Sequence, residues 1–403
     1  MFENLIGQDS VRDQLQGALN NKTLPKALLF SGEAYAGKLT AALELARGIT
    51  CKNGDARWDC DCRSCRDHRL IVNPDILILG NRYFMSEIKA SAELLIRTRA
   101  VFAQYMYIRN IRKLLKRFEP IIWEGMEKKL SRYSRTLSQL TEKMEQLDPG
   151  KDLPEEGDLK KILDETTTLA RNLLPAVPRG IPVDQVRNIS RWAHRTSTGT
   201  AKIVIMEQAE KILESASNSL LKILEEPPSH VTFILLTERK GVLISTILSR
   251  VRNYDFAPRS RATSAAILEK LFRTEPKNMQ LSEYFQEWSD LDYNFLKDKV
   301  RIFVDASVNR GSLTDLDDLF QFIDKNRDKT LLGSFLKLLT EEIKRRFKEN
   351  PEWQGSVAGQ KVVKDVMTEI NICHVNSEIY NQNSLFLLEC LFYKTRDIYE
   401  ALC

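Results

Sequence analysis

Apolar and polar positions alternate in blocks between residues 215 and 251, and the blocks predict a helix, a buried strand and a second short helix. The first helix carries three leucines and is expected to end before Pro227-Pro228, because the residue before proline disfavours the helical region. The apolar run Val231–Leu236 follows, which is typical of a strand buried on both faces. The second helical segment ends by presenting Arg250.

A similar pattern near the N-terminus predicts a phosphate-binding loop. The strand Lys26–Gly32 is followed by Gly-Glu-Ala-Tyr-Ala-Gly-Lys-Leu and then by a helix over Ala41–Ile49. This is the frame G-x-x-x-x-G-K that normally continues with Ser or Thr. Its backbone N–H groups and helix N-terminus cradle phosphates, and the hydroxyl after the lysine holds Mg²⁺. Gly32, Gly37 and Lys38 are therefore candidate nucleotide ligands.

The loop departs from that frame at the position of the hydroxyl. Leu39 stands there and cannot ligate a metal ion. Thr40 is one residue further on, about 100° around the helix, so it is a poor substitute, although we include it among the candidate residues. The frame indicates ancestry more strongly than it indicates chemistry.

A second strand predicted at the same site ends in polar residues. Lys202–Met206 is apolar in its centre and leads into Glu207 and Gln208. Glu207 is suited to lie near Mg²⁺, but the amide of Gln208 cannot accept a proton as a general base. A core strand with solvated charges at its end fits these residues better than a catalytic strand. Thr237, after the Val231–Leu236 run, is a further candidate nucleotide-site residue.

Together these segments resemble the clamp-loader branch of the AAA+ ATPases, and within it the family of bacterial DNA polymerase III delta-prime subunits. The resemblance starts at Phe2–Gln8, covers Leu24–Ile49, resumes at Ile181–Arg187 and continues through Arg252. It implies an α/β fold: an AAA+ (P-loop type) parallel-sheet domain with a zinc module and a helical insertion, then a small helical lid domain and an all-α collar domain.

The resemblance also implies that one subunit binds ATP while its neighbour supplies an arginine to it. Delta-prime subunits typically have a decayed nucleotide site but keep a Ser-Arg-Cys motif, whose arginine reaches the ATP of a neighbouring subunit. Here that motif is Ser249-Arg250-Val251, so Arg250 is expected to act in trans as an arginine finger. Tyr35, Leu39 and Gln208 all depart from the pattern of active relatives, and no Gly-x-x-Arg follows Pro258.

The expected function is thus a non-hydrolysing subunit of the DNA polymerase III clamp loader, with doubtful ATP binding and no ATPase activity of its own, acting in sliding-clamp loading during DNA replication. The implied partners are gamma/tau and delta subunits in a hetero-oligomeric ring, with the sliding clamp and primer–template DNA reached through the complex. The alternatives are an active gamma/tau-type ATPase and a DNA-binding scaffold.

Composition agrees with this class of protein. The 403 residues carry a net charge of +5, which does not by itself imply affinity for nucleic acid. There is no N-terminal signal peptide and no apolar run of transmembrane length, so a cytoplasmic protein with no membrane contact is expected. Seven cysteines in a chain of this length do not suggest a disulfide framework.

Four of the cysteines predict a metal site. Cys51, Cys60, Cys62 and Cys65 cluster directly after the loop helix, and thiolates at this density suit tetrahedral Zn²⁺. The family's zinc module matches in position and in its terminal C-x-x-C pair. Cys60 and Cys62 are separated by one residue, whereas the family has two, and His68 is an alternative ligand. We therefore expect a structural zinc module over residues 51–68.

The family pattern offers no counterpart between Gly80 and Gly180. An apolar heptad seam over Trp123–Leu147 predicts a coiled-coil helix that packs on the stripe Val101–Phe118 and not on the ATPase-like domain. A shorter helix over Asp158–Leu174 closes this helical hairpin. The basic run Arg109–Arg117 is expected to be a solvated helix face, with DNA contact as the alternative.

These expectations divide the chain into four parts. They are an AAA+-like nucleotide-site domain over 1–80 and 179–257, a helical coiled-coil insertion over 81–178, a helical lid over 258–306 and a helical collar for oligomerisation over 307–403.

Overall fold

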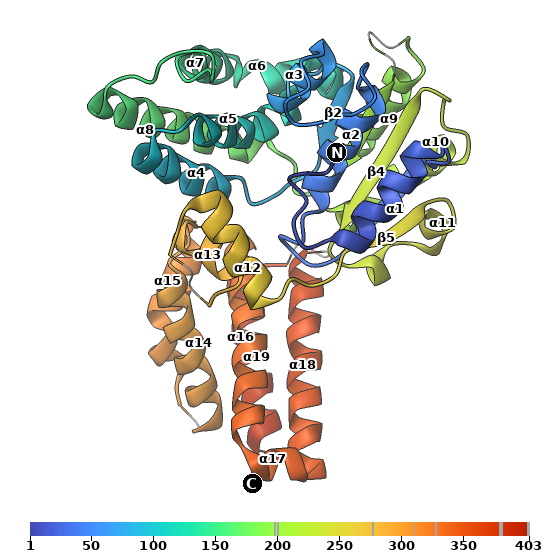
Figure 1. Ribbon diagram of the computed structural model, residues 1–403. Helices are drawn as coiled ribbons and strands as arrows, with labels where there is room; N and C mark the ends of the chain where they lie inside the picture. The colour runs from blue at the N-terminus through green and yellow to red at the C-terminus, as the bar shows by residue number, and fades with distance from the viewer. Residues whose placement is uncertain are drawn as a thin grey trace. The chain divides into compact units, whose positions relative to one another are not determined.

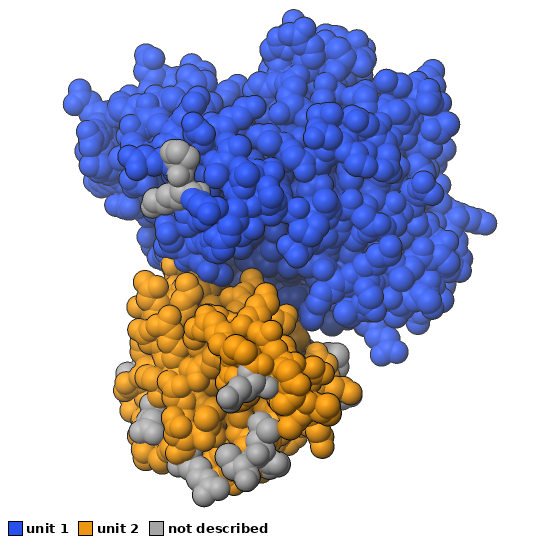
Figure 2. Space-filling view, turned by 60° about the horizontal axis from the view of Figure 1, so that its bottom comes forward, with its two compact units in different colours: residues 1–288 blue, residues 289–403 orange. Residues whose placement is uncertain are grey.

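The structure is a computed structural model that describes residues 1–196, 199, 201–275, 278–309, 311–326, 329–378 and 382–400. The chain forms two compact units, Met1–Trp288 and Ser289–Cys403, which Figure 2 distinguishes by colour. The sequence places its domain boundaries elsewhere, at 257/258 and 306/307. The four-part scheme therefore stays a prediction.

The first unit is built on a five-stranded parallel sheet with the strand order β2-β3-β4-β1-β5. Three of the strands were predicted from their apolar runs, whereas β2 and β5 were not. Leu29 of β1 lies opposite Leu235 of β4, and Val204 of β3 lies opposite Phe233. The strands are β1 (Ala27–Ser31), β2 (Ile76–Leu79), β3 (Lys202–Met206), β4 (Val231–Thr237) and β5 (Arg252–Asp255).

Both faces of the sheet are buried, because successive side chains of a strand point to opposite faces. On β1, Leu28 and Phe30 belong to one apolar core, while Ala27 and Leu29 belong to the other. The first core includes residues of α1 and α2, and the second includes residues of α4, α5, α8, α9 and α10. These helices are α1 (Asp9–Asn20), α2 (Lys38–Thr50), α4 (Phe84–Thr98), α5 (Val101–Leu115), α8 (Glu156–Leu173), α9 (Val183–Ala193) and α10 (Glu214–Glu225).

The prediction of one coiled-coil helix over Trp123–Leu147 is wrong. The segment forms a 3-10 turn, η2 (Pro120–Trp123), and two shorter helices, α6 (Glu127–Ser131) and α7 (Ser134–Glu145). Gly125 interrupts the seam with a left-handed φ of +80°, and Tyr133 N bonds Leu130 O at 2.9 Å in a tight turn before α7. Local backbone preference at these two points outweighs the apolar periodicity.

The expected packing of that segment is also corrected. Helix α7 packs on α8, and α5 packs on α4, so the arrangement is not a two-helix hairpin (Figure 1). Ile108 and Ile111 of α5 lie in the same apolar core as Leu77 and Leu79 of the sheet. The helices between β2 and α9 are therefore part of the core of the first unit. The closing helix was placed correctly, since α8 spans Glu156–Leu173.

The remaining elements are helical in the described part of the chain, as expected after Pro258. In the first unit, α12 and α13 contribute Ile267, Leu281 and Phe285 to the core that contains α5. The second unit has its own core, which includes Leu296, Phe303 and Phe335. None of the described helices combines the length and hydropathy needed to cross a bilayer. The other helices are α3 (Arg63–Arg69), α11 (Ser245–Leu248), α12 (Arg261–Ile267), α13 (Leu281–Glu287), α14 (Tyr293–Val308), α15 (Asp317–Asn326), α16 (Lys329–Glu349), α17 (Pro351–Gly355), α18 (Val357–Glu378) and α19 (Ser384–Glu400).

Candidate functional site

The predicted phosphate loop joins β1 to α2, and its lysine is bonded to the loop itself. Gly37 has a φ of +101°, and a Cβ there would lie 2.7 Å from Nη2 of Arg259. Lys38 Nζ donates to the carbonyl oxygens of Gly32 at 2.5 Å and Glu33 at 2.6 Å. Burial lowers the pKa of Lys38. The amine that would contact a phosphate therefore satisfies backbone carbonyls.

Tyr35 stands in the middle of the predicted phosphate loop. Its φ of +60° lies in the left-handed region that side-chain-bearing residues rarely adopt. Its ring stacks on Phe285 of α13, with centroids 4.8 Å apart and planes at 10°, and on Tyr83 at 5.2 Å. These three rings connect the phosphate loop to α13 and to the segment after β2. Phosphate would have to approach a loop whose centre carries a stacked aromatic ring.

Glu207, the predicted metal-site carboxylate at the end of β3, is buried and bound by two arginines. Arg82 Nη1 donates to one carboxylate oxygen at 2.5 Å, and Arg117 Nη2 donates to the other. Gln208 has a left-handed φ of +52°, and its buried Oε1 has no hydrogen-bond partner in the described part of the chain. Both oxygens of Glu207 are thus engaged by guanidinium groups where a nucleotide-bound Mg²⁺ would need them.

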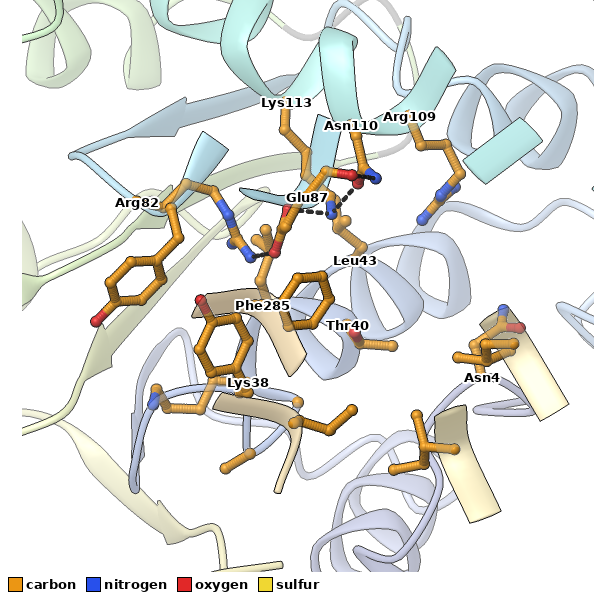
Figure 3. Close-up of a pocket in the computed structure, with 18 of the residues that line it drawn as sticks. Asn4, Lys38, Thr40, Leu43, Arg82, Glu87, Arg109, Asn110, Lys113 and Phe285 are labelled. Atoms are coloured by element: carbon orange, nitrogen blue, oxygen red, sulfur yellow. Dashed lines mark hydrogen bonds and ion pairs between the residues drawn. The ribbon is translucent and has the colours of Figure 1, made fainter. Parts of the chain in front are cut away.

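The same ion network continues to α4 and α5 through Glu87. Arg82 donates to Glu87 Oε1, and Lys113 Nζ donates to Glu87 Oε2 at 2.9 Å. Figure 3 shows Arg82 and Lys113 on either side of this carboxylate. Burial opposes ionisation of Glu87, but the two cations lower its pKa to about 2. Burial also lowers the pKa of Lys113 to about 8 and that of Arg117 to about 10. Three largely buried cations thus share two buried carboxylates.

The other predicted nucleotide-site residues lie near these groups. Leu39 is only 6% exposed and is part of an apolar core, and both Leu39 and Thr40 line the cavity described below. Thr237 Oγ1 donates to Glu210 Oε2 at 2.7 Å and accepts from Arg239 N at 3.1 Å. The structure therefore brings the predicted residues together, but it also supplies internal partners for several of them.

A cavity of about 390 Å³ lies beside the phosphate loop (Figure 3). One wall comes from the loop and α2, a second from α4 and α5, and a third from α12, α13 and the segment Leu268–Phe272. Its charged lining residues are Lys38, Arg82, Glu87, Arg109, Lys113, Glu207, Glu238 and Arg259. This lining is mixed in charge, with more cations than anions.

The basic run Arg109–Arg117 lies in α5 and in the 3-10 turn Lys116–Phe118 that follows it. It is neither a solvated face nor a free DNA-binding surface, so both interpretations are corrected. Lys116 and Arg117 are 4% and 3% exposed. Lys116 Nζ donates to Asn73 O at 2.9 Å, and Arg112 Nη1 donates to Leu70 O at 2.9 Å. Arg109 Nη1 donates to Arg69 O at 2.8 Å. These cations bond carbonyls that follow or end α3, where the helix dipole favours positive charge.

The four predicted metal-ligating cysteines come together in space. The Sγ atoms of Cys51, Cys60, Cys62 and Cys65 all lie within 4.8 Å of one another, and those of Cys51 and Cys60 are 3.8 Å apart. Tetrahedral Zn–S bonds of about 2.3 Å place sulfur atoms ~3.8 Å apart, so this donor set can bind a metal ion. Burial opposes ionisation of Cys62, but backbone N–H donors lower its pKa to about 7, which favours a thiolate ligand.

His68, the alternative ligand, does not belong to this group of four. Its Nε2 lies 2.7 Å from Thr50 Oγ1, and its side chain is buried. Burial lowers the pKa of His68 to about 3, with the nearby arginine and lysine charges adding to the shift. The geometry therefore supports four thiolates as the metal ligands.

Arg250 follows α11 and is not among the residues that line the cavity. Its Nε donates to Glu225 Oε1 at 2.9 Å, Nη2 donates to the same oxygen, and Nη1 donates to Thr246 O at 2.7 Å. The side chain remains 30% exposed. Within this chain, then, the predicted finger is paired with the last residue of α10, and its position is distinct from that of the chain's own nucleotide-like site.

Arg82, Glu87, Lys113, Arg117 and Phe285 are the site residues that sequence reasoning missed. Arg82 carries a usable signal, since it follows Gly80 and the apolar run 76–79. The ends of parallel strands meet at one edge of a sheet, so a charge after this run is expected near Glu207. Arg117 and Phe285 carry no comparable local signal.

The sequence matches a family model described as DNA polymerase III, delta subunit, over residues 7–130 and 153–260. The expectation that residues 81–178 lack a family counterpart is therefore wrong for 81–130 and 153–178. Most of the residues outside the match within this region belong to α7 and its flanks.

Individual relatives are similar over parts of their length. The chain is 35% identical to DNA polymerase III subunit tau of Bacillus subtilis over 285 residues, which is 70% of this chain and 33% of that protein. It is 37% identical to DNA polymerase III subunit delta' of Haemophilus influenzae over 87 residues, 21% of this chain and 26% of that protein. The chain thus spans a third or less of these relatives' length. A gamma subunit-related protein of Thermotoga maritima aligns at a TM-score of 0.41 and 16% identity, covering 96% of this chain and 100% of that one.

The site geometry predicts that the purified chain does not hydrolyse ATP, and that the double variant Leu39→Thr, Gln208→Glu does not either. The substitutions restore a hydroxyl and a carboxylate, but Glu207 stays bound to Arg82 and Arg117. Phosphate release from Mg²⁺-ATP is the measurement, with Lys38→Ala as the background control. Turnover by the unaltered chain above that background would contradict the prediction.

Glu87 should make the free energy of unfolding depend on pH in acid. Its folded-state pKa of about 2 lies below the ordinary value of 4.5. Such a carboxyl contributes stability above its unfolded pKa and loses that contribution as the pH falls through the folded pKa. The stability difference between the unaltered chain and Glu87→Gln should therefore shrink from pH 5 toward about pH 2, measured by urea denaturation. Glu93→Gln, at an exposed position of the same helix, is the control. A difference equal at pH 3 and pH 7 would refute this assignment.

Proposed function

This chain belongs to the DNA polymerase III, delta subunit family, and from that membership we propose that it is a delta-prime-like clamp-loader subunit that hydrolyses no ATP itself. In this role it supplies Arg250 to ATP bound by a neighbouring gamma/tau-type subunit, within a ring that also contains a delta subunit. The ring places a sliding clamp on primer–template DNA. The observation that carries the proposal is the capture of Glu207 by Arg82 and Arg117.

The pairing of Glu207 with the two arginines supports the proposal that this chain's own nucleotide site is inactive. Removing one partner of a buried ion pair leaves an uncompensated charge, which costs about 3–5 kcal/mol. A metal ion that took Glu207 from the two arginines would leave both guanidinium groups buried beside it. Tyr35 and Leu39 act in the same direction, because one crowds the loop and the other offers no ligand.

The position and bonding of Arg250 support a role in trans. The residue does not line the cavity of its own chain, so it serves a second chain or none. Its pair with Glu225 is partly exposed, and exposed ion pairs contribute only about 0–1 kcal/mol. A phosphate oxygen can therefore replace the carboxylate at small cost, while the pair keeps the guanidinium ordered before assembly.

An active gamma/tau-type ATPase is the second candidate, and the similarity to the Bacillus subtilis tau subunit over 70% of this chain favours it. Two features oppose this candidate: the ion pairs around Glu207, and the lack of a Gly-x-x-Arg sequence after Pro258. The cations of α5 also weaken the third possibility, a DNA-binding scaffold, because they are bonded to carbonyls and carboxylates within the chain.

The four-cysteine cluster completes the proposal as a structural zinc site. Arg69 Nη1 donates to the carbonyl oxygens of Trp58 at 2.5 Å and Cys60 at 2.7 Å, which ties the loop to α3. Zinc bound by the four thiolates would fix the loop, which contains little apolar core of its own.

Arg250→Ala is expected to leave folding and ring assembly intact and to lower ATP turnover at one partner site by about 10³-fold or more. The measurement is steady-state ATP hydrolysis and clamp loading by the complete loader containing the variant. Arg252→Ala, an exposed arginine two residues away on β5, is the matched control. Normal turnover by the Arg250→Ala loader would show that the arginine is structural and that the proposed mechanism is wrong.

Metal analysis of protein purified without chelator should find about one Zn²⁺ per chain, as expected for a single four-thiolate site. The double variant Cys62→Ser, Cys65→Ser should release the metal and speed hydrogen exchange of residues 51–68. The single variant Cys373→Ser, whose sulfur is buried in the second unit, is the control and should retain it. Metal-free protein with an unchanged loop would exclude the site.

A further inference from the structure

Arg109 of α5 faces the cavity without a bonded carboxylate. Its Nη1 donates to the carbonyl oxygens of His68 at 3.1 Å and Arg69 at 2.8 Å. A guanidinium has five N–H groups, and those on Nε and Nη2 have no hydrogen-bond partner in the described part of the chain. Arg109 is one of the residues that line the cavity, and its side chain holds these donors beside it. They form an unused, fixed set of hydrogen-bond donors beside an open volume.

The other cations that line the cavity are bonded to groups of the chain, and Arg259 donates from Nε and Nη2 to Ala36 O. Lys113 bonds Glu87 and Asn110, and Lys38 bonds the carbonyls of its own loop. Arg82 bonds Glu207 and Glu87, as described above. Figure 3 shows Arg109 and Lys38 on opposite sides of the cavity, with Thr40 between them. The free donors of Arg109 are therefore separate from the phosphate loop.

The charge around Arg109 is incompletely balanced. The guanidinium lies 5.4 Å from the ring centre of Trp58, and Arg47 lies at the same distance from that ring. The carboxylate whose charge acts on both arginines is Glu44, but its oxygens are bonded to Arg47 and Asn4. One carboxylate thus serves two largely buried guanidinium groups. Burial lowers the pKa of Arg109 to about 10, in agreement with a charge that lacks a full partner.

We propose that this wall of the cavity is a binding subsite for an oxyanion, the phosphate group of a small molecule, with Arg109 as its principal ligand. A bidentate contact between the free N–H groups and two phosphate oxygens would use the donor geometry of arginine and balance the excess positive charge. The cavity of about 390 Å³ admits a group larger than the phosphate alone, and the side chains of Tyr105 and Met106 line it next to Arg109. The guanidinium bonds the phosphate oxygens directly, so the subsite needs neither a metal ion nor a carboxylate to hold one.

The test is isothermal titration calorimetry of the full chain in EDTA, with inorganic phosphate in one arm and AMP in the other. Arg109→Gln should weaken binding by about ten-fold or more, as expected for the loss of charge-assisted hydrogen bonds. Tighter binding of AMP would identify a nucleotide as the source of the phosphate group, and equal binding would identify free phosphate. Both outcomes support an oxyanion subsite.

Two further variants keep the test decisive. Arg112→Gln removes a second arginine of α5 that bonds the end of α3, at Leu70 O, but does not line the cavity, so binding should be unchanged. Met106→Glu adds a carboxylate one helical turn before Arg109 and should abolish binding with Arg109 still present. Circular dichroism checks the folding of each variant.

Three results would overturn the proposal. The first is the absence of binding by either ligand tighter than about 10 mM. The second is unchanged binding by folded Arg109→Gln or Met106→Glu. The third is loss of binding in Lys38→Gln with retention in Arg109→Gln, because the anion would then sit on the phosphate loop.

Discussion

The buried pairing of Glu207 with Arg82 and Arg117 is the interaction on which most of this structure depends. It joins the end of β3, the segment after β2 and the 3-10 turn Lys116–Phe118 after α5 at one edge of the sheet. Burying a carboxylate is costly unless cations pair with it, and buried cations in turn need an anion. Each element is therefore fixed by the other two.

The same requirement explains how α5 is attached to the rest of the unit. Its apolar face enters the core shared with the sheet, while its arginines and lysines bond the carbonyls around the end of α3 and the carboxylate of Glu87. Arg117, in the 3-10 turn that follows α5, bonds Glu207. Three of the clustered cysteines precede helix α3 in the chain, and the fourth, Cys65, lies within it. The candidate metal module, α5 and the nucleotide-like site are consequently parts of one connected structure.

This arrangement also relates an ancestral frame to its altered chemistry. The strand, loop and helix of a phosphate-binding site are present, and both end glycines keep positive φ values. The charges that a nucleotide and its metal would bring have been replaced by side chains of the protein: Lys38 bonds loop carbonyls, and guanidinium groups bond Glu207. A site satisfied in this way gains nothing from Mg²⁺ at Glu207, and it leaves the excess positive charge on the far wall, at Arg109.

The sequence by itself determined the local features of this protein. Apolar runs bounded by proline and glycine predicted β1, β3 and β4, because burial on both faces of a parallel sheet leaves a continuous apolar signature. The positions of the cysteines predicted their clustering in space, and the loop frame predicted the position of Lys38. Only the tertiary structure decided which charged residues are buried and which groups they pair with. Arg117 and Glu207 are 90 residues apart, and Arg82 and Glu207 are 125 apart, so no local pattern links them. Whether a basic helix face is solvated or buried depends on carbonyls and carboxylates that other elements bring to it, and these become neighbours only when the chain folds.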